Sequence, residues 1–211
     1  MSKPTPQFLT QRSVLALAVT TLVTLSACAL PERVPQRRGT EVAVLEGTGL
    51  SELNPSDVAV APVIIYMLEA DQQLRDAVPV LGLRQAMQRA LVRRRYSPLA
   101  LDFVDSRVVD ASYTAGSVGE QAMCEVIVHA WSERYWKTDR VLDVDVEVRM
   151  LDPMAEAESL PLWAGRMKGE VEVNSITNYR AEARLREDIL DEIALELLAR
   201  MPARDTSPAQ Q

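Results

Sequence analysis

The strongest constraint on the fold is a strict alternation of apolar and charged residues over residues 141–151. The apolar set is Leu142, Val144, Val146, Val148 and Met150, and the charged set is Asp143, Asp145, Glu147 and Arg149. A period of two places these sets on opposite faces of a β-strand. We therefore expect an antiparallel sheet with one face buried and the other solvated.

Residues 163–173 repeat the pattern. Met167, Val171 and Val173 are expected to face inward, and Arg166, Lys168, Glu170 and Glu172 outward. A hairpin of the two segments would place Asp145 beside Lys168 and Glu147 beside Arg166. Such pairs of opposite charge favour one register.

Two amphipathic helices accompany these strands. The first is predicted from Pro79 to about residue 95, with an apolar stripe of Leu83, Met87, Ala90 and Leu91 and with Arg84, Arg89 and residues 93–95 outward. The second is predicted over residues 178–201, with inward Leu185, Ile189, Leu190, Ile193, Ala194, Leu197 and Met201.

Shorter segments complete the prediction. Strands are expected at residues 58–65, 96–104 and 123–131, a short helix at 105–113 and a loop at 116–119. This order predicts one α/β (α+β) domain, a two-layer sandwich whose mixed, mostly antiparallel sheet carries helices on one face.

The N-terminal segment has the form of a secretory signal. Lys3 and Arg12 precede the apolar residues 13–25, and the small residues Ser26 and Ala27 follow. A membrane span needs about 20 apolar residues, and the apolar segment at residues 13–25 is shorter. A cleaved signal is therefore favoured over a membrane-spanning helix. The alternative is an uncleaved anchor, because residues 13–30 carry no charge.

The four residues Leu25-Ser26-Ala27-Cys28 resemble the lipobox of bacterial lipoproteins. The resemblance implies cleavage between Ala27 and Cys28, and acyl chains such as palmitate on Cys28. Two or three such chains hold a protein stably on a membrane. With Ala29 after the cysteine, the resemblance also implies the outer membrane, with the protein facing the periplasm.

The predicted organisation follows from these boundaries. Residues 1–27 form the signal peptide, 28–56 a lipidated tether rich in proline and arginine with a short extended piece at 41–45, 57–201 the periplasmic domain and 202–211 a disordered tail. Cleavage leaves 184 residues that retain all 30 acidic residues and lose only Lys3 and Arg12 of the basic ones, for a net charge of −9. This acidic balance disfavours nucleic acid as a partner.

The search for catalytic, metal and cofactor sites yields no candidates. The single histidine, His129, excludes sites that need two. It lies five residues from Cys124, and on one strand an odd separation places the two on opposite faces. Cys124 is expected to be a buried small apolar residue. Asp143, Asp145 and Glu147 could supply paired carboxylates, but their alternation favours a solvated face.

An aromatic cluster is the candidate partner site. Trp131, Tyr135 and Trp136 lie together, with Arg134 and Lys137 between or beside them. Large rings beside basic side chains are common in protein interfaces. The alternative is that the rings cover one end of the core.

A second resemblance covers residues 57–173. A strand at 57–61 ending before a proline, the segment Ile127-Val-His-Ala-Trp131 and the pair Leu151-Asp152 followed by Leu162-Trp163-Ala-Gly165 resemble a poorly characterised family of Gram-negative lipoproteins. The resemblance implies a fold similar to the N-terminal domain of the Tol translocation protein and to lipoproteins of the curli-secretion and penicillin-binding-protein-activator type. Here residues 153–160 form a longer connection than that family usually has.

These observations predict a non-enzymatic accessory lipoprotein of the cell envelope that binds a protein partner. The first alternative is a carrier of a lipid or small ligand, which needs an apolar pocket between sheet and helices. The second is a hydrolase that uses surface carboxylates. The sequence specifies neither the partner nor the oligomeric state.

Overall fold

The computed structural model describes residues 36–206, except for residues 48, 68–71, 110–111, 157–158 and 173–181. The described residues belong to one compact unit. The predicted signal peptide, Ala27 and Cys28 lie outside them. None of the helices within the described ranges is long and apolar enough to cross a membrane.

The main sheet has the strand order β1-β9-β8-β7-β2-β4, and the short β3 also pairs with β7. Its strands are β1 (Gln36–Glu46), β2 (Asp57–Val60), β3 (Ile64–Ile65), β4 (Ser97–Pro98), β7 (Ala122–Ser132), β8 (Val141–Leu151) and β9 (Trp163–Glu172). Pairing is antiparallel from β1 to β7, whereas β2, β3 and β4 join in parallel.

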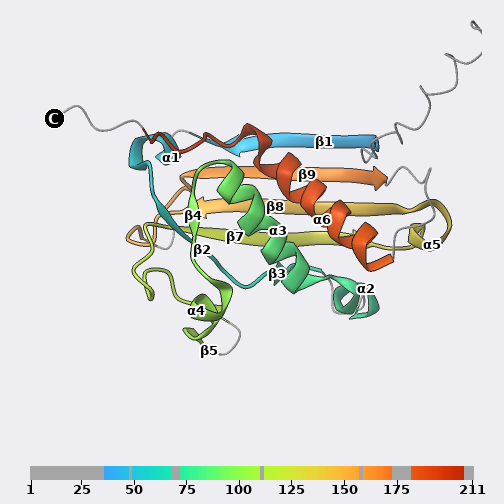
Figure 1. Ribbon diagram of the computed structural model, residues 1–211, viewed down its shortest axis with the longest axis horizontal. Coiled ribbons are helices and arrows are strands. Elements are labelled where there is room, and N and C mark those ends of the chain that lie inside the picture. Colours follow the sequence, from blue (N-terminus) through green and yellow to red (C-terminus); the bar gives the residue numbers. More distant parts are fainter. Residues whose placement is uncertain are drawn as a thin grey trace, which may run out of the picture. The chain divides into compact units, whose positions relative to one another are not determined.

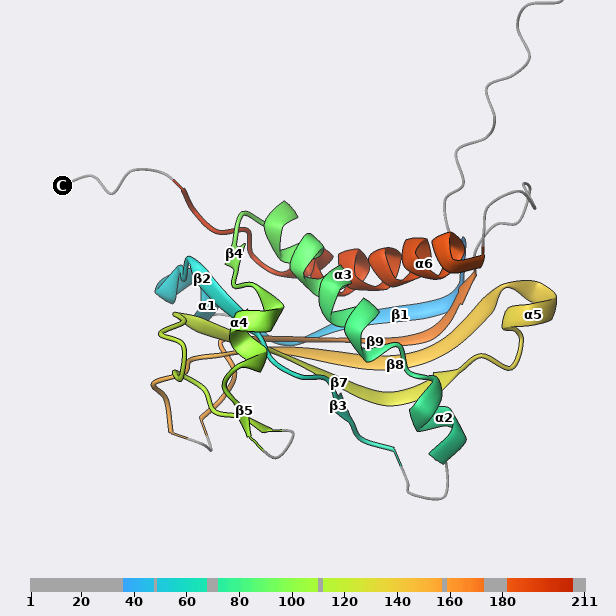
Figure 2. The same cartoon turned by 60° about the horizontal axis from the view of Figure 1, so that its bottom comes forward.

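Helices α3 (Val80–Arg93) and α6 (Glu182–Leu197) lie on one face of this sheet, as Figures 1 and 2 show. The short elements are α1 (Gly49–Leu53), α2 (Gln72–Ala77), α4 (Leu101–Asp105), α5 (Trp136–Asp139), the two-stranded β5 (Val108–Val109) and β6 (Ser112–Tyr113), and a 3-10 turn (Leu198–Arg200) after α6. The predicted fold class, a two-layer α/β sandwich with a mostly antiparallel sheet, is confirmed.

The core lies between the sheet and these two helices. Both predicted helical stripes are buried, and so are the five alternate apolar residues of β8. Trp163 shares this inner face with Gly165, and a Cβ on Gly165 would lie only 2.5 Å from the Trp163 ring. The Leu-Trp-Ala-Gly segment therefore requires glycine, because the indole occupies the space above that residue.

The predicted β8–β9 hairpin is confirmed with its register. Asp145 pairs with Lys168 and Glu147 with Arg166 in the strand ladder. The ion pair, however, forms diagonally, because Arg166 donates two hydrogen bonds to Asp145 at 2.6 and 2.9 Å. Diagonal neighbours on one sheet face are within reach of a long arginine side chain.

The predicted tether over residues 28–56 needs correction. Its second half folds, with residues 36–46 forming edge strand β1 against β9 and residues 49–53 forming α1. The pairing is non-local, since the Thr40 hydroxyl donates to the Glu170 carbonyl 130 residues away. The folded domain therefore begins about twenty residues before the predicted boundary at residue 57.

The predicted disordered tail also needs correction for residues 202–206. The Tyr96 hydroxyl donates to the Pro202 carbonyl at 2.9 Å, and the Arg204 amide donates to the Arg94 carbonyl at 3.0 Å. Asp205 exchanges two hydrogen bonds between its backbone and the Asn54 side chain. Residues 207–211 lie outside the described ranges.

Three smaller predictions were wrong. The strand predicted over residues 96–104 is limited to β4, because α4 begins at Leu101. Arg84 is buried rather than outward, and it donates to Asp105 at 3.0 Å and to the Val60 carbonyl at 2.8 Å. It thereby ties α3 to the end of β2 and to α4. The helix predicted over residues 105–113 lies earlier, as α4, and the strands β5 and β6 follow it.

Candidate functional site

Three regions of the domain carry candidate functional residues: the turn between β7 and β8, the sheet face away from the helices, and a cleft. The first and third lie at opposite ends of the sheet. We call the end where Gln36, Val141 and Glu172 align across β1, β8 and β9 the entry end, because the described chain enters the sheet there. The other, where Glu46, Leu151 and Trp163 lie, is the far end.

The predicted aromatic cluster lies at the entry end, and its three rings differ in exposure. Trp131 and Trp136 are 2% and 1% exposed, whereas Tyr135 is 43% exposed. The two tryptophans therefore belong to the core, which corrects their predicted partner role and confirms for them the alternative that the rings cover one end of the core. Tyr135 retains a ring at the surface, with the Arg134 guanidinium 5.3 Å from its centre.

Trp136 is held by the start of α6. Its indole Nε1 donates to Glu182 at 3.1 Å, and the guanidinium groups of Arg140 and Arg186 lie 5.5 and 5.0 Å from its ring centre. Arginine over an aromatic face is attracted by the ring quadrupole. These contacts attach the β7–β8 turn to the helix layer.

The same arginine secures the turn from the other side. Arg186 donates two hydrogen bonds to Glu133, at 2.6 and 2.7 Å, and the Trp131 indole reaches the same carboxylate at 3.4 Å. The hydrogen bonds from Arg186 lower the pKa of Glu133, although burial opposes them. The turn is thus a rigid support from which Arg134, Tyr135 and Lys137 project.

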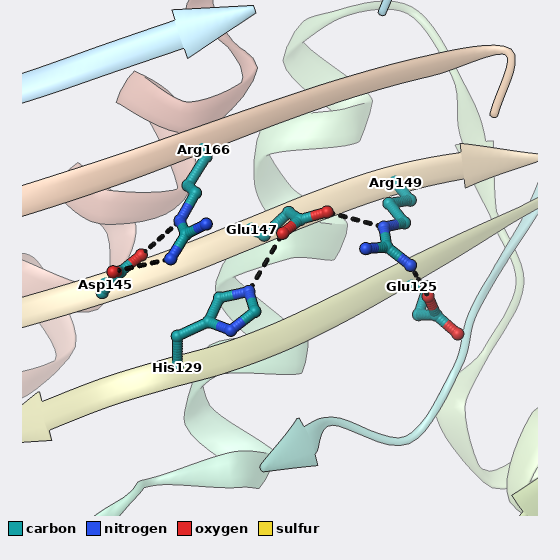
Figure 3. A network of polar contacts seen from close by, with 6 residues as sticks. All are labelled: Glu125, His129, Asp145, Glu147, Arg149 and Arg166. Atoms are coloured by element: carbon teal, nitrogen blue, oxygen red, sulfur yellow. Dashed lines mark hydrogen bonds and ion pairs between the residues drawn. The ribbon is translucent and has the colours of Figure 1, made fainter. Parts of the chain in front are cut away.

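The sheet face away from the helices carries a polar network (Figure 3). His129 Nε2 lies 2.9 Å from Glu147 on the neighbouring strand, and Arg149 donates to the same carboxylate at 2.6 Å and lies 3.8 Å from Glu125. Asp145 and Glu147 are only 6% and 5% exposed. The expectation that they form a freely solvated face was wrong, because neighbouring side chains cover them.

The carboxylates of this network are paired with basic side chains rather than arranged for catalysis. Arg166 lowers the pKa of Asp145, and hydrogen bonds from Arg149 and His129 lower the pKa of Glu147 against the cost of burial. A glycosidase needs one carboxyl group held protonated, with a raised pKa. Desolvation does raise the pKa of Glu125, but Arg149 stands between Glu125 and Glu147. We therefore assign the network to strand registration.

Cys124 and His129 lie on opposite faces of β7, as predicted. Cys124 is fully buried in the core, whereas His129 belongs to the outer network and its side chain is 21% exposed. Burial raises the pKa of the Cys124 thiol to about 12. The thiolate, which is the reactive form, is therefore scarce at neutral pH.

The third region is a cleft of about 620 Å³ at the far end. Its lining is Leu53, Asn54, Pro55, Ser56, Glu120, Gln121, Asp152, Pro153, Met154 and Arg204. Leu53 is 44% exposed and Met154 is 87% exposed, and Leu160, on the same β8–β9 connection as Met154, is 78% exposed. Sequence reasoning missed this region, although the long connection at residues 153–160 was a signal for it.

The loops around the cleft are held by side chains. Glu120 accepts hydrogen bonds from the Tyr113 hydroxyl and from the backbone amides of Gly116 and Val118. Asp152 accepts one from the Met154 amide at 2.8 Å. The Glu120 contacts hold the loop on one side of the cleft, and the Asp152 contact holds the turn that carries the exposed Met154.

The arrangement offers no cofactor or metal chemistry that we can assign. Within the described ranges, no group of three or more His, Cys, Asp or Glu residues is placed to hold a metal ion. The described cleft lies at an end of the sheet and has a mixed lining of polar and apolar residues. It therefore differs from the apolar pocket between sheet and helices that a lipid carrier requires.

Comparison with known proteins gives only remote likenesses. No family model matches the sequence, and no curated protein matches it. Similar solved structures include a PelC dodecamer from Paraburkholderia phytofirmans (TM-score 0.47, 14% identity, 79% of this chain and 99% of that chain). A DUF4136 family protein from Bacteroides thetaiotaomicron has a TM-score of 0.40, with 10% identity over 75% of this chain and 93% of that one.

Lipoprotein GNA1162 from Neisseria meningitidis is also similar, with a TM-score of 0.36 and 16% identity over 66% of this chain and 99% of that chain. A lipoprotein is thus among the structural neighbours, while the resemblance to Tol and curli-secretion proteins stays a prediction. At these TM-scores we draw no functional conclusion from any of the neighbours.

Proposed function

We propose that this protein is a lipid-anchored periplasmic lipoprotein that binds a protein partner at the far end of its sheet and carries out no chemistry of its own. The observation that carries the anchor is the Leu25-Ser26-Ala27-Cys28 segment directly after an apolar signal core. The acyl chains on Cys28 hold the protein on the outer membrane, because the net negative charge of the mature protein as a whole supplies no membrane affinity of its own.

The partner site is assigned to Leu53 and Met154, which line the cleft, together with Leu160, which is exposed on the same β8–β9 connection as Met154. Exposed apolar side chains grouped around a concavity are typical of protein interaction sites, and methionine adapts readily to a partner's surface. Exposed carboxylates of Glu52 and Glu156 flank this group. A partner that complements this surface is a protein segment with apolar side chains next to lysine or arginine.

The anchor is tested by metabolic labelling with a radioactive fatty acid. The wild-type protein is expected to take up label and to begin at Cys28 after processing. Cys28→Ser should take up none and should retain residues 1–27, because a hydroxyl cannot replace the thiolate. Label retained by the Cys28→Ser protein would contradict the lipid anchor.

The partner site is tested by crosslinking in intact envelopes. The double variant Met154→Asp and Leu160→Asp should lose the crosslinked product, because charges at an apolar anchor oppose burial. Val92→Asp is the matched control, since Val92 is also exposed, at 58%, but lies on α3. A product that persists in the double variant, or that Val92→Asp also removes, would contradict the assignment.

A further inference from the structure

The start of β1 and the β7–β8 turn lie close together at the entry end of the sheet. The ladder aligns Gln36 with Glu172 and Glu172 with Val141, and Val141 directly follows α5. Adjacent strands lie about 4.8 Å apart, so Gln36 and Val141 are separated by roughly 10 Å. The described chain therefore begins beside the β7–β8 turn, at the end marked by α5 in Figure 1.

The chain between Cys28 and Gln36 limits how the domain can stand on a membrane. Eight residues span at most about 28 Å when fully extended. The eleven residues of β8 extend about 35 Å at roughly 3.4 Å per residue. With acyl chains on Cys28, the far end cannot rest on the membrane while the strands stand upright, because the start of β1 would lie out of reach.

The β7–β8 turn has the side chains of a membrane-contacting surface. Arg134, Tyr135 and Lys137 are exposed, Arg134 stacks on the tyrosine ring, and these two basic groups outnumber the exposed acidic residue of α5, Asp139. Tyrosine is enriched at the membrane–water interface, where its ring lies at the level of the lipid headgroups. Basic side chains near the membrane surface are attracted to anionic lipid. The buried Trp136 between Arg134–Tyr135 and Lys137 keeps the turn fixed to α6.

We propose that the β7–β8 turn rests on the phospholipid surface through Arg134, Tyr135 and Lys137, so that the domain stands on its entry end. This inference rests on the proposed lipid anchor and adds an orientation to it. The occupant of the turn is a bilayer that contains anionic phospholipid. The cleft and the apolar residues of the far end then point away from the membrane.

Site-specific fluorescence tests the orientation in the full acylated protein. A bimane label is placed at Thr138→Cys in the turn or, as the matched control, at Ala155→Cys at the far end. Cys28 carries lipid and Cys124 is buried with a raised pKa, so the introduced thiol is the one that reacts. The protein is reconstituted in phosphatidylethanolamine and phosphatidylglycerol vesicles containing a nitroxide headgroup lipid.

We expect fluorescence at Thr138→Cys to fall severalfold on reconstitution and fluorescence at Ala155→Cys to stay unchanged. Adding Arg134→Glu, Tyr135→Ser and Lys137→Glu should abolish the quenching. The control pair Arg93→Glu and Arg95→Glu, at and just after the C-terminal end of α3, should leave it unchanged. The three substituted turn residues are exposed and Trp136 is unchanged, so the fold should be retained. A thermal melt checks this. Equal quenching of both labels, or quenching that survives the turn substitutions, would overturn the proposal.

Failure of the anchor itself is recognised separately. Intact mass reports whether the purified protein carries acyl chains before reconstitution. A protein without acyl chains contradicts the proposed function and, with it, this inference. An acylated protein whose turn label is not quenched contradicts the orientation alone.

Discussion

The entry and far ends of the sheet share the same strands but hold their exposed side chains in different ways. At the entry end, Tyr135 projects from a turn whose next residue, Trp136, is buried and is enclosed by Arg140 and Arg186. At the far end, Met154 and Leu160 project from the long β8–β9 connection, on which the Met154 amide donates to the Asp152 carboxylate. The first arrangement suits a fixed contact with a surface, and the second suits an adaptable contact with a protein.

The comparison of the two ends shows that a cluster of aromatic residues does not by itself indicate an interface. Two of the three rings in the cluster are needed to join the sheet to α6, and only one is exposed. The large exposed apolar side chains at the far end are aliphatic and thioether groups. They lie in a segment of low aromatic content, where a search for rings finds nothing.

The largest expected effect comes from removing the support of the entry end. Trp136→Ala should lower the free energy of unfolding by about 3–5 kcal/mol, because it deletes a buried ring and leaves a cavity. Met154→Ala at the far end should change it by less than about 0.5 kcal/mol, since exposed positions contribute little. Urea denaturation of both variants measures the contrast, and equal losses would remove the distinction between the two ends.

A smaller loss is expected within the structural part of the far end. Gly165→Ala should destabilise the domain by about 1–3 kcal/mol, because the added methyl group must displace the buried Trp163 ring. Gly119→Ala is an informative contrast. There φ is +74° but no atom lies within 4 Å of the added Cβ, so any cost arises from backbone strain alone. Thermal unfolding of Gly165→Ala at the wild-type midpoint would show that the ring moves freely.

A pH-dependent effect is expected at the entry end. Because Arg186 lowers the pKa of Glu133 in the folded state, their pairing stabilises the fold above the unfolded pKa of about 4.3 and is lost as pH falls below it. Glu133→Gln and Arg186→Gln should both flatten the decline in stability between about pH 5 and pH 3. Chemical denaturation across this range measures it. A slope unchanged in both variants would show that the ion pair is not linked to folding.

The parts of the fold that could be predicted are those with a local signal. The alternation in β8 fixed the inward residues and the hairpin register, and the stripes of α3 and α6 predicted their buried faces. Strand β1 was predicted only as a short extended piece at residues 41–45 of the tether, because the arginine-rich and glycine-containing start of the strand is typical of a linker. Its pairing with β9 joins residues about 130 positions apart.

The candidate sites were less predictable for the same reason. The burial of Trp136 depends on Glu182 and Arg186, which lie 46 and 50 residues further along the chain. The burial of Arg84 likewise depends on Asp105 and on the Val60 carbonyl. The side-chain types of Trp136 and Arg84 do not indicate these distant partners. The far-end site could not be predicted either, because the sequence does not show that Leu53 and Met154 line one cleft.

Photocrosslinking in intact cells tests the contrast between the two ends most directly. A benzophenone amino acid replaces Tyr135 in one strain and Met154 in the other, in the otherwise native acylated protein. We expect phospholipid adducts and no protein adduct from position 135, and a discrete protein adduct from position 154. A protein adduct from position 135 together with lipid adducts from position 154 would contradict this prediction.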